Sequence, residues 1–255
     1  MLKRLIASAD YYLNKRPLYV APRGAQDYRK AHAQRREALA DAGRLLIERM
    51  KLNLDSDMLG AGVTDYAALY GYVTQRRPAR VLELGTGITT AVMAAAMEEI
   101  GHGKLVTVDH IQQYSNEGRA LLSNPQKARV DFVVAAVVTE EFKGSTALHY
   151  RGVPAMDYDM IFVDGPPVIF GRTQYPSTDA MHVVARSDRP IDIIVDRRLQ
   201  TLNHYSLWLD CDVVFDAALS LGVIASVDKT KLRASPRRKP SLLLANALDA
   251  LRLSA

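Results

Sequence analysis

The feature that most constrains the fold of this chain is a series of short apolar, β-branched runs that alternate with longer helical stretches. The runs lie at residues 81–84, 105–108, 130–134, 160–163 and 191–195. Two more runs, at residues 213–215 and 223–227, follow each other closely and predict an antiparallel pair. Strands that alternate with helices form βαβ units, so the sequence predicts an α/β fold with a doubly wound, mainly parallel sheet of about seven strands.

The two ends of the chain flank this central pattern. Apolar side chains recur at helical spacing within residues 26–52, which predicts an N-terminal helical extension over residues 1–60. Residues 61–228 then form the predicted sheet domain. Residues 229–255 are expected to be a basic linker followed by an amphipathic helix at 241–253. That helix is expected to pack on the body or to mediate a homodimer rather than to bind a membrane.

Basic residues are concentrated at both ends of the chain. Residues 1–36 hold nine Lys and Arg against two Asp, and residues 229–240 hold six basic residues and no acid, whereas the whole chain has a formal net charge of only +5. Such ends can bind nucleic acid, anionic lipid or an acidic partner, or they are solvated segments that aid solubility. Because no nucleic-acid-binding motif accompanies them, nucleic acid is not the expected partner.

Membrane and secretion signals are absent from the sequence pattern. No apolar run approaches the ~20 residues that a membrane-spanning helix needs. The apolar stretch within the first ten residues is too short for a signal peptide. Cys211 is the single cysteine, which excludes an internal disulfide and a multi-cysteine zinc site. We therefore expect a cytoplasmic protein.

A glycine-rich turn follows the first predicted strand and precedes a helix. Gly85 and Gly87 let the backbone turn sharply and approach a ligand closely, and the helix start offers free N–H groups. Glu83 lies within the apolar strand, where a buried carboxylate needs a partner; a ligand ammonium group or the amides of the turn are candidates. Asp109 closes the second strand, where an acid can accept hydrogen bonds from ribose hydroxyls.

These residues resemble the class I S-adenosylmethionine-dependent methyltransferases. Residues 83–90, Glu-Leu-Gly-Thr-Gly-Ile-Thr-Thr, are similar to the first motif of that family, and residues 106–110, Val-Thr-Val-Asp-His, to its second. A bacterial subgroup that modifies small molecules and glycans is the closer match. Its features are a Val-Asp-Gly-Pro-Pro turn, a following Arg and an Asp that closes the fifth strand. Here they are residues 163–167, Arg172 and Asp196.

The resemblance covers residues 60–228 and implies a Rossmann-like sheet with S-adenosylmethionine as the cofactor. It implies that Glu83, Gly85, Thr86 and Gly87 cradle the methionine end. Asp109 would then hold the ribose, His110 would lie near the adenine, and Asp164 would complete the cofactor site. It also implies O-methylation of a small-molecule acceptor or a sugar hydroxyl. Two positions depart from the pattern: Thr89 replaces a third glycine, and residues 134–137 lack a polar side chain for the adenine amine.

Asp164 and Asp196 form a second acidic pair at the ends of the fourth and fifth strands, and we predict both as catalytic. One alternative is purely structural, through a salt bridge from Asp164 to Arg197 or from Asp196 to Arg172. Another is Mg²⁺ binding, since Mg²⁺ prefers oxygen ligands and can lower the pKa of an acceptor hydroxyl. The third is a metal-free role, in which Asp164 orients or deprotonates the acceptor. Because Arg197 follows Asp196 and no third acid is evident, no metal ligand is predicted.

Other classes of protein remain open at this stage. A nicotinamide-dependent dehydrogenase would need a third glycine at position 90, which is Thr90. A non-catalytic cofactor-binding module and an aminopropyl transferase would use the same fold. Several side chains rank lower as site candidates, and we expect most to be structural: His182, His204, Tyr175, Tyr205 and Trp208. Thr64 and Asp65 are interpreted only as N-cap candidates for a helix over residues 66–75.

Overall fold

A nine-stranded sheet forms the centre of the computed structural model, which describes residues 18–20, 25–52, 62–167, 169–170, 173–217 and 219–253. From one edge to the other, its strands are β1 (Leu18–Val20), β13 (Ser241–Leu244), β11 (Val214–Asp216), β12 (Leu221–Val227), β10 (Ile191–Asp196), β7 (Met160–Val163), β2 (Arg80–Leu84), β3 (Lys104–Asp109) and β4 (Val130–Val134). The neighbouring strands β4, β3, β2, β7 and β10 are parallel, and β12 is antiparallel to both of its neighbours. The predicted α/β fold with an antiparallel pair is confirmed.

The C-terminal segment departs from the prediction. A helix was expected over residues 241–253, but Ser241–Leu244 is strand β13, and only α9 (Ala247–Ala250) is helical. The pattern of this short apolar run is compatible with a helix or a strand. It forms a strand here because the edge of β11 is open to pairing: Leu243 pairs with Val214, and Leu242 is fully buried. This strand and β1 bring the sheet to nine strands rather than about seven. The predicted boundary at residue 228 therefore does not separate the C-terminal segment from the sheet.

The basic residues 229–240 also lie against the body. They begin with the short 3₁₀ helix η2 (Lys229–Lys231), after which Leu232 bridges to Leu209. The backbone N–H of Arg233 donates to the Trp208 carbonyl at 2.9 Å. This segment is therefore not a free linker.

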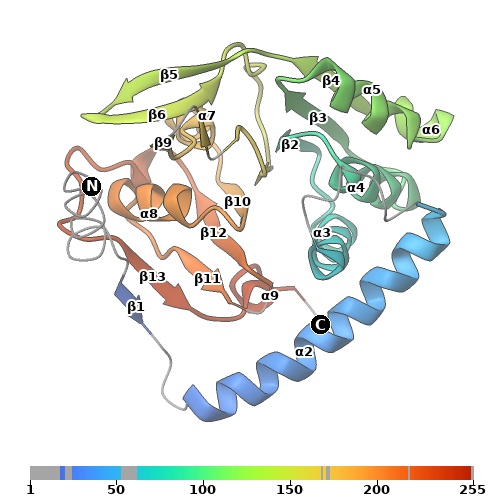
Figure 1. Cartoon of the computed structure of the whole chain (residues 1–255), viewed down its shortest axis with the longest axis horizontal. Coiled ribbons are helices and arrows are strands. Elements are labelled where there is room, and N and C mark those ends of the chain that lie inside the picture. The colour runs from blue at the N-terminus through green and yellow to red at the C-terminus, as the bar shows by residue number, and fades with distance from the viewer. Residues whose placement is uncertain are drawn as a thin grey trace.

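Helices cover both faces of the sheet (Figure 1). One face packs against α3 (Val63–Arg76), α4 (Ile88–Glu99) and the C-terminal half of the long helix α2 (Ala25–Met50). The other packs against α7 (Asp179–Arg186) and α8 (Leu199–Trp208). Helices α5 (Gln112–Ala120) and α6 (Asn124–Lys127) contact β4 and α4. The N-terminal helix expected within residues 26–52 is confirmed by α2, whereas β1 shows that the extension is not entirely helical.

The alternation of side-chain direction along β2 determines where the carboxylate of Glu83 points. Successive side chains of a strand point to opposite faces, so Leu82 and Leu84 join the core beneath α7 and α8, whereas Val81 joins the core beneath α3 and α4. Glu83 shares the face of Val81. The carboxylate is thereby directed at the first turn of α4.

A hairpin that the sequence reading missed is inserted between β4 and β7. Strands β5 (Val137–Phe142) and β6 (Ser145–Tyr150) pair in antiparallel fashion, with Phe142 opposite Ser145. The two-residue loop, Lys143 and Gly144, has positive φ angles of 50° and 81°. That geometry is typical of a hairpin turn, and the Lys-Gly pair between two alternating runs was its signal in the sequence.

Two further observations complete the fold. A very short second hairpin consists of β8 (Ile169–Phe170) and β9 (Thr173–Gln174). Within the described parts of the chain, every helix falls short of the length and apolarity needed to cross a bilayer.

Candidate active site

The site lies where the strand order reverses, between β2 and β7. In doubly wound sheets this switch point opens a crevice at the carboxyl ends of the strands. Here the turns that follow the two strands approach each other closely. Gly85 has a φ of +98°, and a Cβ at this position would lie 2.8 Å from the carbonyl atoms of Asp164. A Cβ on Gly165 would lie 2.2 Å from the Tyr150 hydroxyl, so both turns require glycine.

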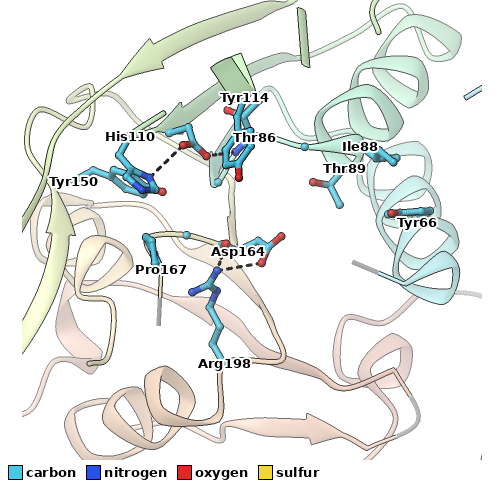
Figure 2. Close-up of a pocket in the computed structure, with 14 residues that line it drawn as sticks. Tyr66, Thr86, Ile88, Thr89, His110, Tyr114, Tyr150, Asp164, Pro167 and Arg198 are labelled. Carbon is cyan, nitrogen blue, oxygen red and sulfur yellow. Dashed lines mark hydrogen bonds and ion pairs between the residues drawn. The ribbon is translucent and has the colours of Figure 1, made fainter. Parts of the chain in front are cut away.

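A cavity of about 260 Å³ opens at this crevice (Figure 2). It brings together six of the residues predicted for the cofactor site: Gly85, Thr86, Gly87, Asp109, His110 and Asp164. The sequence reading missed several other lining residues: Tyr66, Tyr114, Tyr150 and Arg198. Tyr66 belongs to α3 and Tyr150 ends β6, so only the folded chain shows that they face the glycine turn.

Glu83 lies beneath the turn and does not line the cavity. Its carboxylate is fully buried and accepts hydrogen bonds from the hydroxyls of Thr89, at 2.6 Å, and Thr90. The Thr90 hydroxyl also accepts the Gly87 N–H at 3.1 Å. Burial raises the pKa of Glu83 to about 8, against the opposing effect of the threonine hydroxyls. The partner expected for Glu83, a ligand ammonium or the turn amides, is thus replaced by the first turn of α4.

Asp109 ties the glycine turn to the end of β3. One carboxylate oxygen accepts the Thr86 N–H at 3.0 Å, and the other accepts the Ile111 N–H at 2.8 Å. The side chain of His110 is near, with Nδ1 3.2 Å from the Asp109 carboxylate. Each carboxylate oxygen has two lone pairs, so Asp109 keeps the capacity to accept hydrogen bonds from a ligand.

Aromatic side chains form one wall of the cavity beside Asp109. The rings of His110 and Tyr150 lie with their centroids 6.4 Å apart and tilted by 46°. Burial raises the pKa of Tyr150 well above its ordinary value, so this phenol is neutral at physiological pH. Figure 2 shows both rings on the side of the cavity opposite Tyr66. The wall offers flat, largely apolar surfaces next to a hydrogen-bonding carboxylate.

The predicted acidic pair belongs to a larger charged cluster. Asp164 pairs with Arg198, whose Nη2 lies 3.2 Å from the carboxylate and whose Nη1 donates to the Pro166 carbonyl at 2.5 Å. The Nε atom of Arg197 lies 3.4 Å from a carboxyl oxygen of Asp196. Asp164 therefore forms its salt bridge with Arg198 rather than with Arg197. The other bridge considered, to Arg172, falls outside the described residues.

Asp65 is the third acid that the sequence reading did not find. Its carboxylate lies 3.1 Å from Arg197 and accepts the Gly62 N–H at 3.0 Å. Helix α3 begins at Val63, so Asp65 is in its first turn and is not the N-cap. An acid near a helix start was the only signal in the sequence, and it indicated a cap rather than a site.

Burial raises the pKa of both predicted catalytic acids. It raises the pKa of Asp196 to about 8, helped by the negative charges of Asp164 and Asp65. Burial also raises the pKa of Asp164, but the guanidinium of Arg198 opposes this. Asp196 is buried and does not line the cavity, whereas Asp164 does.

The residues that ranked lower in the sequence lie away from this cavity. Three of them, Tyr175, His204 and Trp208, line a second cavity of about 900 Å³ beside the basic segment at residues 236–240. Tyr205 is fully buried in the core, and His182 contacts Glu140 on β5. All of them are therefore separate from the glycine turn.

A family model of a methyltransferase domain matches residues 82–194. Residues 82–194 are therefore similar to a methyltransferase domain. The match runs from β2 to β10 and so includes the glycine turn, Asp109 and Asp164. Tyr66, Asp196 and Arg198 lie outside the matched segment. No curated protein sequence matches the chain.

Three solved structures are similar to this chain at low sequence identity. The O-methyltransferase TomG from Streptomyces achromogenes, in complex with SAM, is 18% identical over 63% of this chain and 65% of its own, with a TM-score of 0.38. Cofactor-bound Rv0187 from MTB is 14% identical over 88% and 96%, with a TM-score of 0.43. A methyltransferase from Geobacter sulfurreducens is 15% identical over 89% and 96%, with a TM-score of 0.42. This chain spans just under two thirds of the length of TomG.

Proposed function

We propose that this protein is an S-adenosylmethionine-dependent methyltransferase that O-methylates a small molecule or a sugar. The observation that carries the proposal is the contact between the glycine turn and the end of β3, both within the segment that matches a methyltransferase domain. The Asp109 carboxylate holds the Thr86 amide, so the glycine turn and the end of β3 form one rigid cradle beside the cavity. The Val-Asp-Gly-Pro-Pro turn at residues 163–167 supports placement in the bacterial subgroup that modifies small molecules and glycans.

The residues of the cavity fit S-adenosylmethionine. Backbone N–H groups at the start of α4 suit a carboxylate, and the spare lone pairs of Asp109 suit ribose hydroxyls. The rings of His110 and Tyr150 suit one face of a purine. Gly85 keeps this space open, because a side chain there would collide with the turn after β7. The chemistry that the cofactor supplies when bound is a methyl group activated by a sulfonium centre.

Asp164 is our candidate for the group that receives the acceptor's proton. It lines the cavity at the end of β7, and Arg198 holds its carboxylate in place. A general base at this position would take the hydroxyl proton as the oxygen becomes methylated. Asp196 acts through Asp164 as a positioning residue, because it is buried behind the cavity lining and retains its own proton. Holding the acceptor in line accounts for much of the remaining rate.

A magnesium ion does not suit this acid cluster. Arg197 and Arg198 both lie within ion-pair distance of its carboxylates, and their positive charges oppose binding of a dication. We therefore propose a metal-free reaction. We also place the enzyme in the cytoplasm, since its one cysteine, Cys211, leaves no internal disulfide to form.

The nicotinamide alternative conflicts with the contacts of Thr90. A third glycine would be needed there, but the Thr90 hydroxyl holds both Glu83 and the Gly87 amide. A non-catalytic cofactor-binding module would share every contact described above, so only measured methyl transfer separates it from an enzyme.

Calorimetry with the purified chain tests the cofactor assignment. S-adenosylhomocysteine should bind with a dissociation constant of ~1 μM or lower, and NAD should show no binding at ~100 μM. Absence of S-adenosylhomocysteine binding would overturn the proposal. Methyl transfer from labelled S-adenosylmethionine to a panel of phenols, catechols and sugars then identifies the acceptor class, and a cofactor-binding chain inactive on every class would favour the binding module.

A further inference from the structure

A cluster of two histidines and one glutamate lies away from the cofactor cavity. Glu140 belongs to β5, His149 to β6 and His182 to α7, three elements that Figure 1 shows side by side. One potential ligand atom from each of the three residues lies within 4.8 Å of the other two. The imidazole Nε2 of His182 is 2.6 Å from the Glu140 carboxylate, and the two histidine ring centroids are 5.5 Å apart. None of the three lines the cofactor cavity.

We propose that Glu140, His149 and His182 bind one divalent transition-metal ion, with Zn²⁺ as the expected occupant. Two imidazoles and a carboxylate are the ligand types that such ions prefer. Donor atoms around Zn²⁺ lie about 2.0–2.2 Å from the ion, so no two of them are more than about 4.4 Å apart. A cluster already within 4.8 Å needs only small side-chain rotations to close on an ion.

The hairpin register places two of the ligands on one face. Glu140 pairs with Ala147, and His149 lies two residues further along β6. Residues in such diagonal positions point to the same side of a two-stranded sheet. That side faces α7, which supplies His182. The hairpin is not hydrogen-bonded into the nine-stranded sheet, and Leu148 of β6 is hydrogen-bonded to the segment before α7, so an ion held here would add a further link between the hairpin and α7.

The protonation states of His149 and Glu140 suit metal binding near neutral pH. Burial lowers the pKa of His149, with help from the charges of His182 and Arg151 and against the attraction of Glu140, so its imidazole is neutral. Burial alone would raise the pKa of Glu140, but hydrogen bonds from Thr178 and His182 outweigh it, and the pKa lies below its ordinary value. A neutral imidazole and an ionised carboxylate are the forms that bind a metal.

Neighbouring groups orient the proposed ligands. The Thr178 hydroxyl donates to the Glu140 carboxylate and fixes one of its oxygens. The Phe142 ring packs edge-on against His182, with centroids 5.5 Å apart, and forms an apolar wall. Hydrogen bonds to ligands and apolar surroundings are what hold metal ligands in position in known sites. The exposed fraction of the His182 side chain is 39%, which leaves a path for the ion and room for water to complete its coordination.

The test uses the full chain without a polyhistidine tag, stripped with EDTA and dialysed. Calorimetric titration with Zn²⁺ should show one ion per chain with a dissociation constant of ~1 μM or lower. Titration with Co²⁺ should give visible absorption bands that are typical of nitrogen ligation. Zn²⁺ should also raise the melting temperature, because an ion that binds only the folded state stabilises it.

Variants separate this site from adventitious binding. His149→Ala and His182→Ala should each weaken Zn²⁺ binding at least tenfold and abolish the rise in melting temperature. Glu140→Gln retains the shape of the side chain and should weaken binding similarly. His102→Ala, at an exposed histidine between α4 and β3, should bind Zn²⁺ as the wild type does.

Two results would overturn the metal site. One is the absence of stoichiometric Zn²⁺ binding by the wild-type chain, which would leave the His182–Glu140 contact as a simple hydrogen bond. The other is unchanged affinity in folded His149→Ala and His182→Ala proteins. S-adenosylhomocysteine affinity, measured on the same samples, should be the same in all variants, so failure of this site and failure of the proposed function are distinguishable.

Discussion

At the scale of single residues, the site consists of buried and half-buried carboxylates that are compensated in different ways. Hydroxyl groups of α4 satisfy Glu83, and backbone amides satisfy Asp109. A guanidinium satisfies Asp164, whereas Asp196 retains its proton. Because an uncompensated buried charge is costly, these contacts fix which acids are free to meet a ligand. Asp109 and Asp164 line the cavity, and the other two support it.

Asp109→Asn should weaken S-adenosylhomocysteine binding at least tenfold. The amide keeps the shape of the side chain but loses charge-assisted hydrogen bonds worth about 1.5–3 kcal/mol each. Calorimetry on the variant measures the change. Asp131→Asn, at an exposed acid on β4, serves as the matched control and should bind normally. An unchanged affinity in Asp109→Asn would remove the residue from the cofactor site.

Asp164→Asn separates catalysis from packing. We expect S-adenosylhomocysteine affinity to stay within about threefold, a difference below ~0.7 kcal/mol. Methyl transfer to an identified acceptor should fall by roughly 10²-fold, because the proton acceptor is lost. Asp157→Asn, at an exposed acid, should retain full activity. A purely structural role would instead give a lower melting temperature with little loss of rate, and EDTA sensitivity of the wild type would indicate a metal.

Asp196→Asn should show how a buried acid couples stability to pH. The folded-state pKa of Asp196, about 8, lies above its ordinary value of 3.8. Between these values the folded state holds a proton that the unfolded state has released, so the free energy of unfolding falls as the pH rises. Asparagine mimics the protonated acid and lacks this effect. The melting temperature of the variant should therefore rise relative to that of the wild type from about pH 4 to about pH 8, and the difference should stay constant above that pH.

Melting curves of both proteins across that pH range provide the measurement. Asp212→Asn, at an exposed acid, is the control and should follow the wild type throughout. A constant difference between Asp196→Asn and the wild type would mean that Asp196 is ionised in the folded protein.

At the scale of elements, the two turns after β2 and β7 determine the shape of the site. Gly85 and Asp164 approach so closely that each turn limits the conformation of the other. Arg198, at the start of α8, reinforces the turn after β7 through the Pro166 carbonyl. The crevice at the carboxyl ends of β2 and β7 is thus bounded by two turns that are held against each other, and it is more than a gap between strand ends.

Gly85→Ala should destabilise the protein by more than about 1 kcal/mol and weaken cofactor binding. The substitution combines a positive φ of +98° with a Cβ that lies 2.8 Å from the Asp164 carbonyl. Gly152 is a matched control, since its φ is +96° and a Cβ there meets nothing within 4 Å. Chemical denaturation should show a larger loss for Gly85→Ala than for Gly152→Ala. Equal losses would mean that backbone strain alone, and not the contact between the turns, requires glycine.

At the scale of the whole molecule, the C-terminal strand β13 joins β11 to the edge strand β1, and helix α2 contacts the end of β11. Asp216 ends β11 fully buried and accepts the backbone N–H of Ala247 at 2.9 Å. The Arg35 guanidinium of α2 binds the same carboxylate. These contacts join residues from both ends of the chain to one strand. Folding of the central domain and of its terminal segments is therefore coupled.

A chain that ends at Val227 should aggregate or lose its cooperative unfolding transition. The truncation removes β13, which lies between β11 and β1, and exposes their edges. A chain that ends at Leu253 retains β13 and α9 and should behave as the full-length protein does. Solubility and thermal melting of the two proteins decide the point. A soluble, cooperatively folded chain ending at Val227 would show that the C-terminal segment is an independent appendage.

Local patterns in the sequence were sufficient for much of the fold and part of the site. β-Branched runs, glycines and the acids that follow strands reflect the local conformation of only a few residues. The parallel strands, the glycine turn and the position of Asp109 could therefore be predicted. The order of these elements also placed Asp164 at the correct edge of the sheet. Partners could not be predicted in the same way. Arg197 and Arg198 are neighbours in sequence, and only the start of α8 decides which of them meets Asp164.

The sequence by itself determined the class of fold, the glycine turn of the proposed cofactor site and the candidate acid of this protein, because each is encoded by residues close together in the chain. The tertiary structure alone decided that residues 241–244 are a strand, that Asp65 joins the acid cluster, and that Glu140 meets two histidines. Each of these depends on contacts between segments far apart in sequence. A strand edge or a buried charge pairs with the group that the tertiary fold places next to it. The local pattern of apolar and polar residues does not specify which group that is.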